Sequence, residues 1–259
     1  MHSNTRQNLT FNERVHEYDE AMRMDPQARR NEIERIVKLS DIDFHHEILE
    51  IGVATGALTK KIAEVVKKGV VYACDVSENA IRMLAKENIG DNVKLIHTKN
   101  CGQISIKSGS LDRVISLGAF HHIPDEERLD VFKECARVLK TDGLLIIADV
   151  MAKSTTQKFF DQVVDLYSKT GHKHNFFDYK SIKNYLSMAS FELLNFSHEY
   201  SPWKFKSESD LMEFIHKFFS IKISKEMVFT FTEECLGVRE NNSSIELGWN
   251  LMFIKARKL

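Results

Sequence analysis

The chain has 259 residues, of which 43% are hydrophobic and 10% aromatic, so it can form a buried core and is not a disordered chain. Its formal net charge is -1, without the basic excess by which proteins usually hold nucleic acid, so no nucleic-acid partner is expected. The four cysteines are far apart and contain no Cys-x-x-Cys pair, which argues against a zinc site and a disulfide framework.

The N-terminal region predicts a helical cap over residues 1–42. The first dozen residues are polar, lack the apolar core of a signal peptide, and are expected to be loose. Two helices are expected next, at 13–24 and 26–39, because Pro26 suits a first helical position and apolar residues recur with helical spacing. No apolar run approaches the length of a membrane span, so a reduced, soluble, cytoplasmic protein is expected.

Short apolar strands then alternate with helices. The expected strands are 47–51, 70–74, 93–97, 113–117 and 144–150, and the expected helices are 57–68, 78–88 and 124–140. This alternation predicts right-handed β-α-β units and a parallel sheet with helices on both faces, which is a three-layer α/β fold. The polar segment 102–110 is too short for a crossover helix and is expected to be mainly a loop.

The region after the fifth strand predicts two more helices at first. One is expected at 155–170, with apolar residues on one side and Gly171 as its stop. Another is expected to end near residue 189, after a cap at Asp178 or Ser181.

Two late strands are expected at 191–200 and 245–256. Between them, a stretch resembling a capping box precedes an expected helix at 211–219. If the late strands pair, residues 201–244 form an insertion large enough to cover a binding cleft. The chain beyond the cap is therefore expected to be one core, 43–259, that carries a lid at 201–244.

The stretch ILEIGVATGALT, residues 48–59, ends a strand in a turn of small residues and begins a helix at once. Small residues let a ligand approach the backbone, and the helix N-terminus offers free N–H groups. Asp75 ends the next strand, 23 positions beyond Gly52, where a carboxylate can accept both hydroxyls of a ribose. Glu50 and Asp75 could instead only cap helices, but their occurrence together around this turn favours the ribose interpretation.

Two classes of cofactor share this layout. A nicotinamide or flavin site needs Gly-x-Gly-x-x-Gly so that the second glycine admits a pyrophosphate, and here that position is Ala54. Glu50 would also repel a pyrophosphate, whereas its carboxylate suits a ligand that has a positive amino group and no phosphates. This contrast predicts S-adenosylmethionine as the cofactor.

The chain resembles the class I S-adenosylmethionine-dependent methyltransferases, in the small-molecule group that includes the ubiquinone/menaquinone C-methyltransferases. The resemblance lies in ILEIGVATGALT, VYACDVS, SLDRVISLGAFHHIPD and RVLKTDGLLIIADV, which follow the family's order and spacing over residues 46–150. It implies a Rossmann-like, seven-stranded, mostly parallel sheet whose last strand runs antiparallel. The segments 191–200 and 245–256 would supply the sixth and seventh strands.

The resemblance also implies a cofactor site. Its residues would be Tyr18, Glu50, Gly52, Ala54, Gly56, Asp75, Val76, Asn100, Cys101 and Leu117. The first motif would wrap the methionine part, Asp75 would bind the ribose, and Val76 would lie against the adenine. Asn100 and Cys101 replace the usual Asp-Ala that reads the adenine edge, and the Asn100 amide oxygen can still accept a hydrogen bond there.

Two further positions are carried over from the family. The backbone carbonyl of Leu117 would receive the cofactor's amino group, and Tyr18 would touch the methionine end. Ala54 departs from the usual glycine, which is a small change for a tight turn.

Methyl transfer is an in-line displacement at the sulfonium carbon, so the enzyme mainly aligns the acceptor and excludes water. A base is needed only where the attacking atom carries a proton. Candidates near the cleft are His121, His122, Asp149, His172, His174 and Tyr179. Of these, His121, His122 and His172 are the expected catalytic residues. The alternatives are that His121-His122 only shapes a turn, and that His172 and His174 are exposed imidazoles at a helix end.

No metal is expected, because Asp149 is the only acid plausibly placed at the cleft. Aromatic residues crowd the late region, and although most would be core, some predict a hydrophobic or aromatic small-molecule acceptor. Transfer to oxygen, nitrogen or carbon stays open. The alternatives are an RNA or protein methyltransferase, or a fold relative that binds the cofactor without using its methyl group.

Overall fold

The computed structural model describes residues 4–172, 174–241 and 243–259, with side chains from residue 11 onward. Among these residues, no helix combines the length and the apolar character needed to cross a bilayer.

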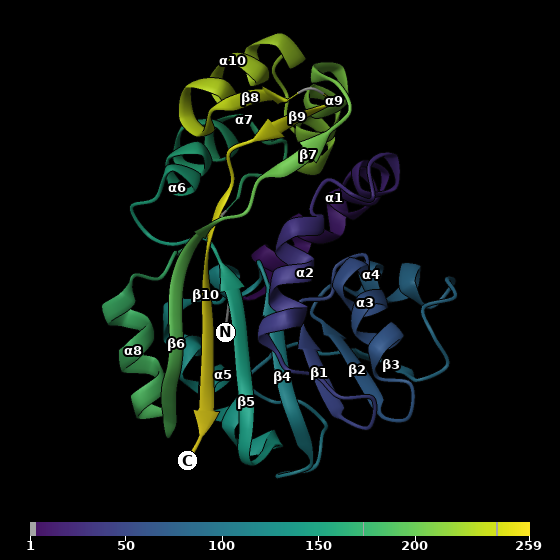
Figure 1. Cartoon of the computed structure of the whole chain (residues 1–259), viewed down its shortest axis with the longest axis vertical. Helices are drawn as coiled ribbons and strands as arrows, with labels where there is room; N and C mark the ends of the chain where they lie inside the picture. The colour runs from purple at the N-terminus through teal and green to yellow at the C-terminus, as the bar shows by residue number, and fades with distance from the viewer. Residues whose placement is uncertain (1–3, 173, 242) are drawn as a thin grey trace.

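The main sheet contains seven strands (Figure 1). They are β1 Glu47–Ile51, β2 Val70–Asp75, β3 Val93–His97, β4 Leu111–Leu117, β5 Leu139–Asp149, β6 Phe191–Tyr200 and β10 Asn250–Lys258. Their order is β3-β2-β1-β4-β5-β10-β6. The first five run parallel, and β10 runs antiparallel to both neighbours, β5 and β6. The predicted seven-stranded, mostly parallel sheet with an antiparallel last strand is confirmed.

Helices cover both faces of this sheet, because alternate strand residues point to opposite sides. On one face, residues such as Ile146 join a core with α2 (Arg30–Leu39) and α3 (Ala57–Val65). On the other face, residues such as Ile147 join a core with α5 (Asp125–Val138) and α8 (Tyr179–Met188). Helix α4 (Glu78–Leu84) contacts β2 and β3. The predicted three-layer arrangement is therefore present.

The N-terminal helices differ from the prediction at their starts. Helix α1 spans Asn4–Met24, so the stretch expected to be loose is helical from residue 4, and it contacts α4 of the core. Helix α2 begins at Arg30 rather than at Pro26. The reason is a turn in which the Asp25 side chain accepts from the Gln27 N–H at 3.3 Å, a local hydrogen bond that competes with helix formation.

The expected helix at 155–170 is shorter and interrupted. It consists of α6 (Thr155–Phe159), a π-helical segment (Phe160–Val164) and α7 (Asp165–Tyr167). Helix α8 begins at the predicted cap, since the Asp178 side chain accepts from the Ser181 N–H at 2.7 Å.

The expected long strand at 245–256 is two strands in different sheets, which corrects the prediction. Strand β9 (Ser244–Leu247) pairs with β7 (Trp203–Phe205) and β8 (Val238–Asn241) in a second sheet, and only β10 joins the main sheet. The break falls at Gly248, where a Cβ atom would lie 2.1 Å from the Leu236 carbonyl oxygen.

The second sheet, together with α9 (Glu208–Phe218) and α10 (Lys225–Leu236), lies beyond the carboxyl ends of the parallel strands (Figure 1). We call residues 203–247 the upper layer. Helix α9 begins three residues earlier than expected, because the Ser207 hydroxyl accepts from the Asp210 N–H at 3.1 Å and caps the helix there. Helix α1 packs against α9, so the N-terminal helix contacts both the core and the upper layer.

Replacing Gly248 with alanine should destabilise the chain, because the new methyl group would collide with the Leu236 carbonyl. We expect Gly248→Ala to lower the free energy of unfolding by about 2–3 kcal/mol, as overpacking does. The control is Gly109→Ala, where no atom lies within 4 Å and only a φ of +63° opposes the methyl group, at a cost of about 1 kcal/mol. Equal losses in urea unfolding of the two variants would contradict the proposed break at Gly248.

Candidate functional site

A pocket lies at the carboxyl ends of β1, β2 and β4, between α1, α2 and the upper layer. Of the predicted cofactor residues, it is lined by Tyr18, Glu50, Gly52, Ala54, Asp75, Val76, Asn100, Cys101 and Leu117. The predicted catalytic residues His121, His122 and His172 line it too. The sequence therefore identified residues that the fold brings to one place, although they come from separate segments.

The turn after β1 is built from residues in the left-handed region of backbone conformation. Gly52 has a φ of +78°, and a Cβ atom there would lie 2.2 Å from the Cβ of Ala119, so only glycine fits. Ala54 accepts a φ of +47° without being glycine. Gly56, with a φ of +79°, caps α3 and lies against Leu84 rather than among the lining residues, so it shapes the turn.

Glu50 is a buried acid that faces this pocket. Its side chain comes from β1, and its Oε2 atom has no hydrogen-bond partner among the described residues. Burial raises the pKa of Glu50 to about 8, because the charged form loses its hydration; the Thr59 hydroxyl opposes this increase and the charge of Asp75 adds to it. A buried acceptor oxygen without a donor costs free energy, so the site is prepared for a ligand that supplies a donor or a positive charge.

Asp75 is held at the end of β2 by two backbone amides. Its Oδ1 accepts from the Ser77 N–H at 2.8 Å, and its Oδ2 accepts from the Ala54 N–H at 2.9 Å. Burial raises the pKa of Asp75, while these hydrogen bonds oppose the increase. Each carboxylate oxygen has lone pairs left for hydroxyl donors, so Asp75 both closes the first turn and can receive a ribose.

The predicted adenine-edge residues lie in the loop after β3. The Asn100 amide oxygen accepts from the Gly102 N–H at 2.6 Å, so it is already used in shaping its own loop. One lone pair of that oxygen stays available to a ligand. Cys101 lines the pocket beside it, and burial raises the pKa of its thiol to about 12, so the thiol is neutral.

His121 and Asp149 form a buried pair at the end of the pocket nearest β4 and β5. The His121 Nδ1 atom lies 2.6 Å from Asp149 Oδ1, and the His121 backbone N–H donates to Asp149 Oδ2 at 3.1 Å. The carboxylate is an acceptor, so Nδ1 carries the proton and Nε2 presents a lone pair. In the described part of the chain Nε2 has no hydrogen-bond partner.

His172 and His174 are not exposed imidazoles at a helix end, which corrects one of the two interpretations from sequence. Their side chains are 5% and 8% exposed, and both pack against Phe160. Burial and neighbouring imidazoles lower the pKa of His172 well below its usual value. Burial also disfavours the His174 cation, but the hydrogen bond and charge of Asp165 outweigh it and raise the pKa of His174.

The remaining two candidates have different positions. His174 lies beside the pocket, in an adjoining hollow that His121 and His172 also line. Tyr179 is about half exposed and packs on Phe196, outside both hollows, so the structure does not place it among the site residues.

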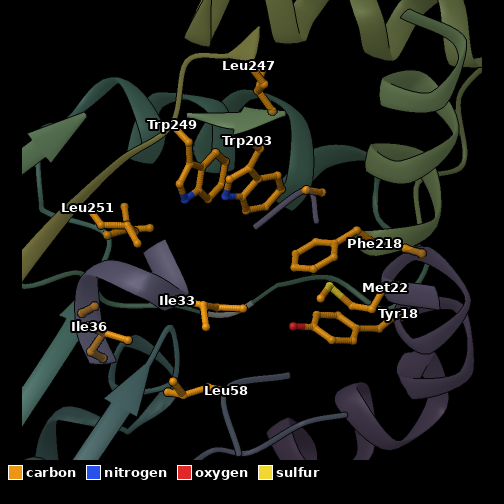
Figure 2. Close-up of a cluster of buried hydrophobic side chains, with 14 of the residues drawn as sticks. Tyr18, Met22, Ile33, Ile36, Leu58, Trp203, Phe218, Leu247, Trp249 and Leu251 are labelled. Carbon is orange, nitrogen blue, oxygen red and sulfur yellow. The ribbon is translucent and has the colours of Figure 1, made fainter. Parts of the chain in front are cut away.

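Aromatic rings from the upper layer, together with Trp249 and Phe160 outside it, form the roof of the pocket. Trp203 stacks on Trp249 with ring centroids 4.2 Å apart, and Phe218 contacts Tyr18 at 4.4 Å (Figure 2). Phe160 and Phe219 also line this end. The aromatic residues of the late sequence thus divide into rings that line the pocket and rings that fill the core around it.

Two arginines and a glutamate of the helical cap also line the pocket, and the sequence analysis missed them. Glu32 is fully buried, accepts from the Trp203 indole N–H at 2.9 Å and pairs with Arg29, which donates to the Tyr18 hydroxyl at 2.6 Å. Arg14 donates to the Phe218 carbonyl at 2.9 Å. The signal for Glu32 was a charged residue on the apolar side of a helix; Arg14 followed a stretch expected to be loose.

Residues 48–143 match the family model of a methyltransferase domain. The matched residues run from β1 into β5 and include the turn at Gly52 and the acid Asp75. An uncharacterized methyltransferase of Geobacillus sp. (strain WCH70) is 32% identical over 127 residues, which are 49% of this chain and 57% of that relative. The chain thus spans little more than half the length of this relative.

Solved structures share the fold. A methyltransferase of Thermotoga maritima, described as a possible histamine N-methyltransferase, has a TM-score of 0.63 and 18% identity, covering 97% of this chain and 99% of its own. The [4+2]-cyclase SpnF has a TM-score of 0.57 and 14% identity, covering 87% of this chain and 79% of its own. The fold shared with these structures thus extends over most of this chain, beyond the matched domain.

Replacing Glu50 with glutamine should change the pH dependence of stability. Because burial raises the Glu50 pKa, the wild-type protein keeps its full stability below pH 4.5, near the Glu50 pKa of the unfolded chain. It loses stability as the pH rises through about 8. We expect Glu50→Gln to gain on the order of 2–4 kcal/mol over the wild type at pH 9 and much less at pH 5.

Urea unfolding of ligand-free protein at both pH values measures this difference. The control is Glu47→Gln on the same strand, which is expected to follow the wild type at both pH values. A gain at Glu50→Gln that is the same at pH 5 and pH 9 would contradict a buried, neutral Glu50.

Proposed function

We propose that this chain transfers the methyl group of S-adenosylmethionine to a small-molecule acceptor with a hydrophobic or aromatic part. The observation that carries the proposal is the unpartnered, buried Oε2 of Glu50, at a pocket formed by the matched methyltransferase motifs. It calls for a cationic ligand, and the cofactor of this domain has a positive amino group. We also propose that the chain belongs to the small-molecule group of methyltransferases that includes the ubiquinone/menaquinone C-methyltransferases.

The cofactor would be held by the residues predicted from sequence. Glu50 and the Leu117 carbonyl would take the amino group, Asp75 the ribose hydroxyls, and Val76 the face of the adenine. The turn at Gly52 lets the ligand approach the backbone closely. When bound, S-adenosylmethionine supplies an activated methyl group on a sulfonium.

The acceptor would lie between the imidazoles and the aromatic roof. His121, His122 and His172 are the proposed catalytic residues, because they line the pocket and the His121 Nε2 lone pair is held in place through Asp149. The chemistry requires the acceptor atom to be aligned and water to be excluded, which a roof of aromatic rings favours. The attacked atom, oxygen, nitrogen or carbon, is set by the acceptor.

A lid and a cap would enclose this acceptor. We propose residues 201–244 as the lid and residues 1–42 as the helical cap of a core at 43–259. Two contacts hold the cap against the lid, which supports a joint enclosure. Glu32 accepts from Trp203, and the Lys204 N–H donates to the Ala28 carbonyl at 3.1 Å. An enclosed, largely apolar chamber favours a small molecule over RNA or a protein as the acceptor.

A second function has one observation in its favour. The [4+2]-cyclase SpnF shares the fold, so a role for this chain that leaves the methyl group in place is the alternative. The two functions differ in their products. Methyl transfer releases S-adenosylhomocysteine, and a rearrangement or scaffold role does not.

We expect S-adenosylmethionine to bind to the chain. Asp75→Asn should weaken the affinity for S-adenosylmethionine by about 10–100-fold, since a lost hydrogen bond to a charged group costs roughly 1.5–3 kcal/mol. Glu50→Gln should weaken binding similarly. The control is Glu47→Gln, which should bind as the wild type does. Isothermal titration calorimetry at pH 8 measures this, and unchanged affinity in both site variants would contradict the assignment.

Methyl transfer should be detectable with cofactor labelled in its methyl group. Incubation with a small-molecule extract of cells should yield a labelled product and an equal amount of S-adenosylhomocysteine. His121→Ala should slow formation of both by at least 100-fold, the lower range for loss of a proton-transfer group, while cofactor affinity is retained. A protein that binds the cofactor but yields no S-adenosylhomocysteine from any extract would favour the non-methylating alternative.

A further inference from the structure

Three imidazoles converge at one end of the pocket although they come from two segments of the chain. His121 and His122 follow β4, and His172 follows α7. One ring nitrogen from each lies within 4.8 Å of those of the other two. The ring centroids are 4.0 Å apart for His121 and His122, 4.8 Å for His122 and His172, and 5.5 Å for His121 and His172.

His121 is oriented as metal-ligating histidines are. Its Nδ1–H donates to the fully buried Asp149 at 2.6 Å, and its Nε2 is left as a buried lone pair without a partner in the described chain. A carboxylate behind a histidine fixes the tautomer and makes the other nitrogen more basic, which is the usual outer shell of a metal site. A neutral side-chain donor could also satisfy Nε2, but the two nearby imidazoles make a cation the better match.

We propose that His121, His122 and His172 bind one divalent transition-metal ion of the zinc class, with a coordination position open to the pocket. Imidazole suits zinc, copper, iron and nickel, and three protein ligands with an open fourth position are typical of catalytic rather than structural zinc sites. No metal was expected from the sequence, because Asp149 is the only acid plausibly placed at the cleft. An all-imidazole site depends on the approach of His172, some 50 residues further along.

A second group of ligands, Asp165, His172 and His174, lies next to the first and shares His172. Its members already have partners: the His174 Nδ1 atom lies 3.3 Å from Asp165 and 3.2 Å from His172 Nδ1, and its Nε2 atom lies 3.3 Å from Asp161 outside the group. The buried, unpartnered nitrogen belongs to His121. The three-histidine group is therefore the one that gains most from a metal.

The charges around this group are of both signs. Arg14 lines the same pocket and opposes a second cation, whereas Asp149 behind His121 favours one, and Asp165 near His172 shares its charge with His174. A site with neutral ligands and acids in the outer shell can therefore hold a divalent ion.

A metal at this position would also specify the class of acceptor, and this part of the inference rests on the proposed methyl transfer. An acceptor hydroxyl bound at the open position would lose its proton to water, because a divalent metal lowers the pKa of a bound O–H group. The resulting oxygen lone pair forms the new C–O bond as the C–S bond breaks, and the sulfur keeps that electron pair in neutral S-adenosylhomocysteine. The acceptor class is then a hydroxyl compound, such as a phenol, with an apolar ring for the aromatic roof.

The test is calorimetric titration of untagged, metal-free full-length protein with Zn²⁺, and with Co²⁺ to record its visible spectrum. We expect one Zn²⁺ per chain and the absorption of four- or five-coordinate cobalt. His121→Ala, His122→Ala and His172→Ala should each lose most of the affinity. Asp149 is a positioning residue, and Asp149→Asn should weaken the affinity for Zn²⁺ by about 10–100-fold.

Matched controls separate ligation from misfolding. His198→Ala on β6, away from the pocket, should bind Zn²⁺ as the wild type does, and His174→Ala should keep most of the affinity. Each variant is checked by thermal melting and by S-adenosylhomocysteine titration, which none of these substitutions should abolish.

Failure to bind Zn²⁺ and Co²⁺ by the wild type would overturn the metal site and leave His121 to act directly as a base. Loss of binding in His174→Ala but not in His121→Ala or His122→Ala would also overturn it, since the metal would then lie in the second group. Formation of S-adenosylhomocysteine from labelled cofactor is measured separately on the same wild-type protein with and without metal. Failure of the metal site is thereby distinguished from failure of the proposed methyl transfer.

Discussion

The pocket depends on one buried charge, Glu32. Its carboxylate is fully buried, pairs with Arg29 and accepts from the Trp203 indole, so it joins the helical cap to the upper layer. A buried carboxylate is costly unless both its oxygens are used, and here each has a donor. Removing Arg29 would leave an uncompensated charge, and removing Trp203 would leave a buried oxygen without its donor. Helix α2 and the roof of the pocket are therefore held together over the strand ends.

Of the buried groups with an unpartnered atom in the described part of the chain, two face the pocket. Glu50 Oε2 and His121 Nε2 are acceptor atoms without donors among the described residues. Such atoms reduce the stability of the free protein and increase its affinity for a ligand that supplies a donor or a positive charge. Glu50 lies at the cofactor motif and His121 at the imidazole cluster. The same physical feature thus marks both ends of the proposed reaction.

The sequence predicted elements best where local pattern and tertiary context agree. Strands β1, β3 and β6 have the predicted bounds, because runs of buried apolar residues end in polar turns there. The predicted strand at 245–256 is wrong across Gly248, since the change of sheet depends on the approach of the Leu236 carbonyl from elsewhere. The early start of α1 was missed because its polar side gives no apolar period, and its contacts with α4 and α9 are tertiary.

The sequence alone determined the parallel sheet, the turn at Gly52 and the acids Glu50 and Asp75, because these follow from residue types at short spacing along consecutive β-α units. Only the tertiary structure decided which residues of the cap and upper layer line the pocket, and that His172 approaches His121. Contacts between segments that are distant along the chain have no local pattern. They arise from how the helices pack over the carboxyl edge of the sheet.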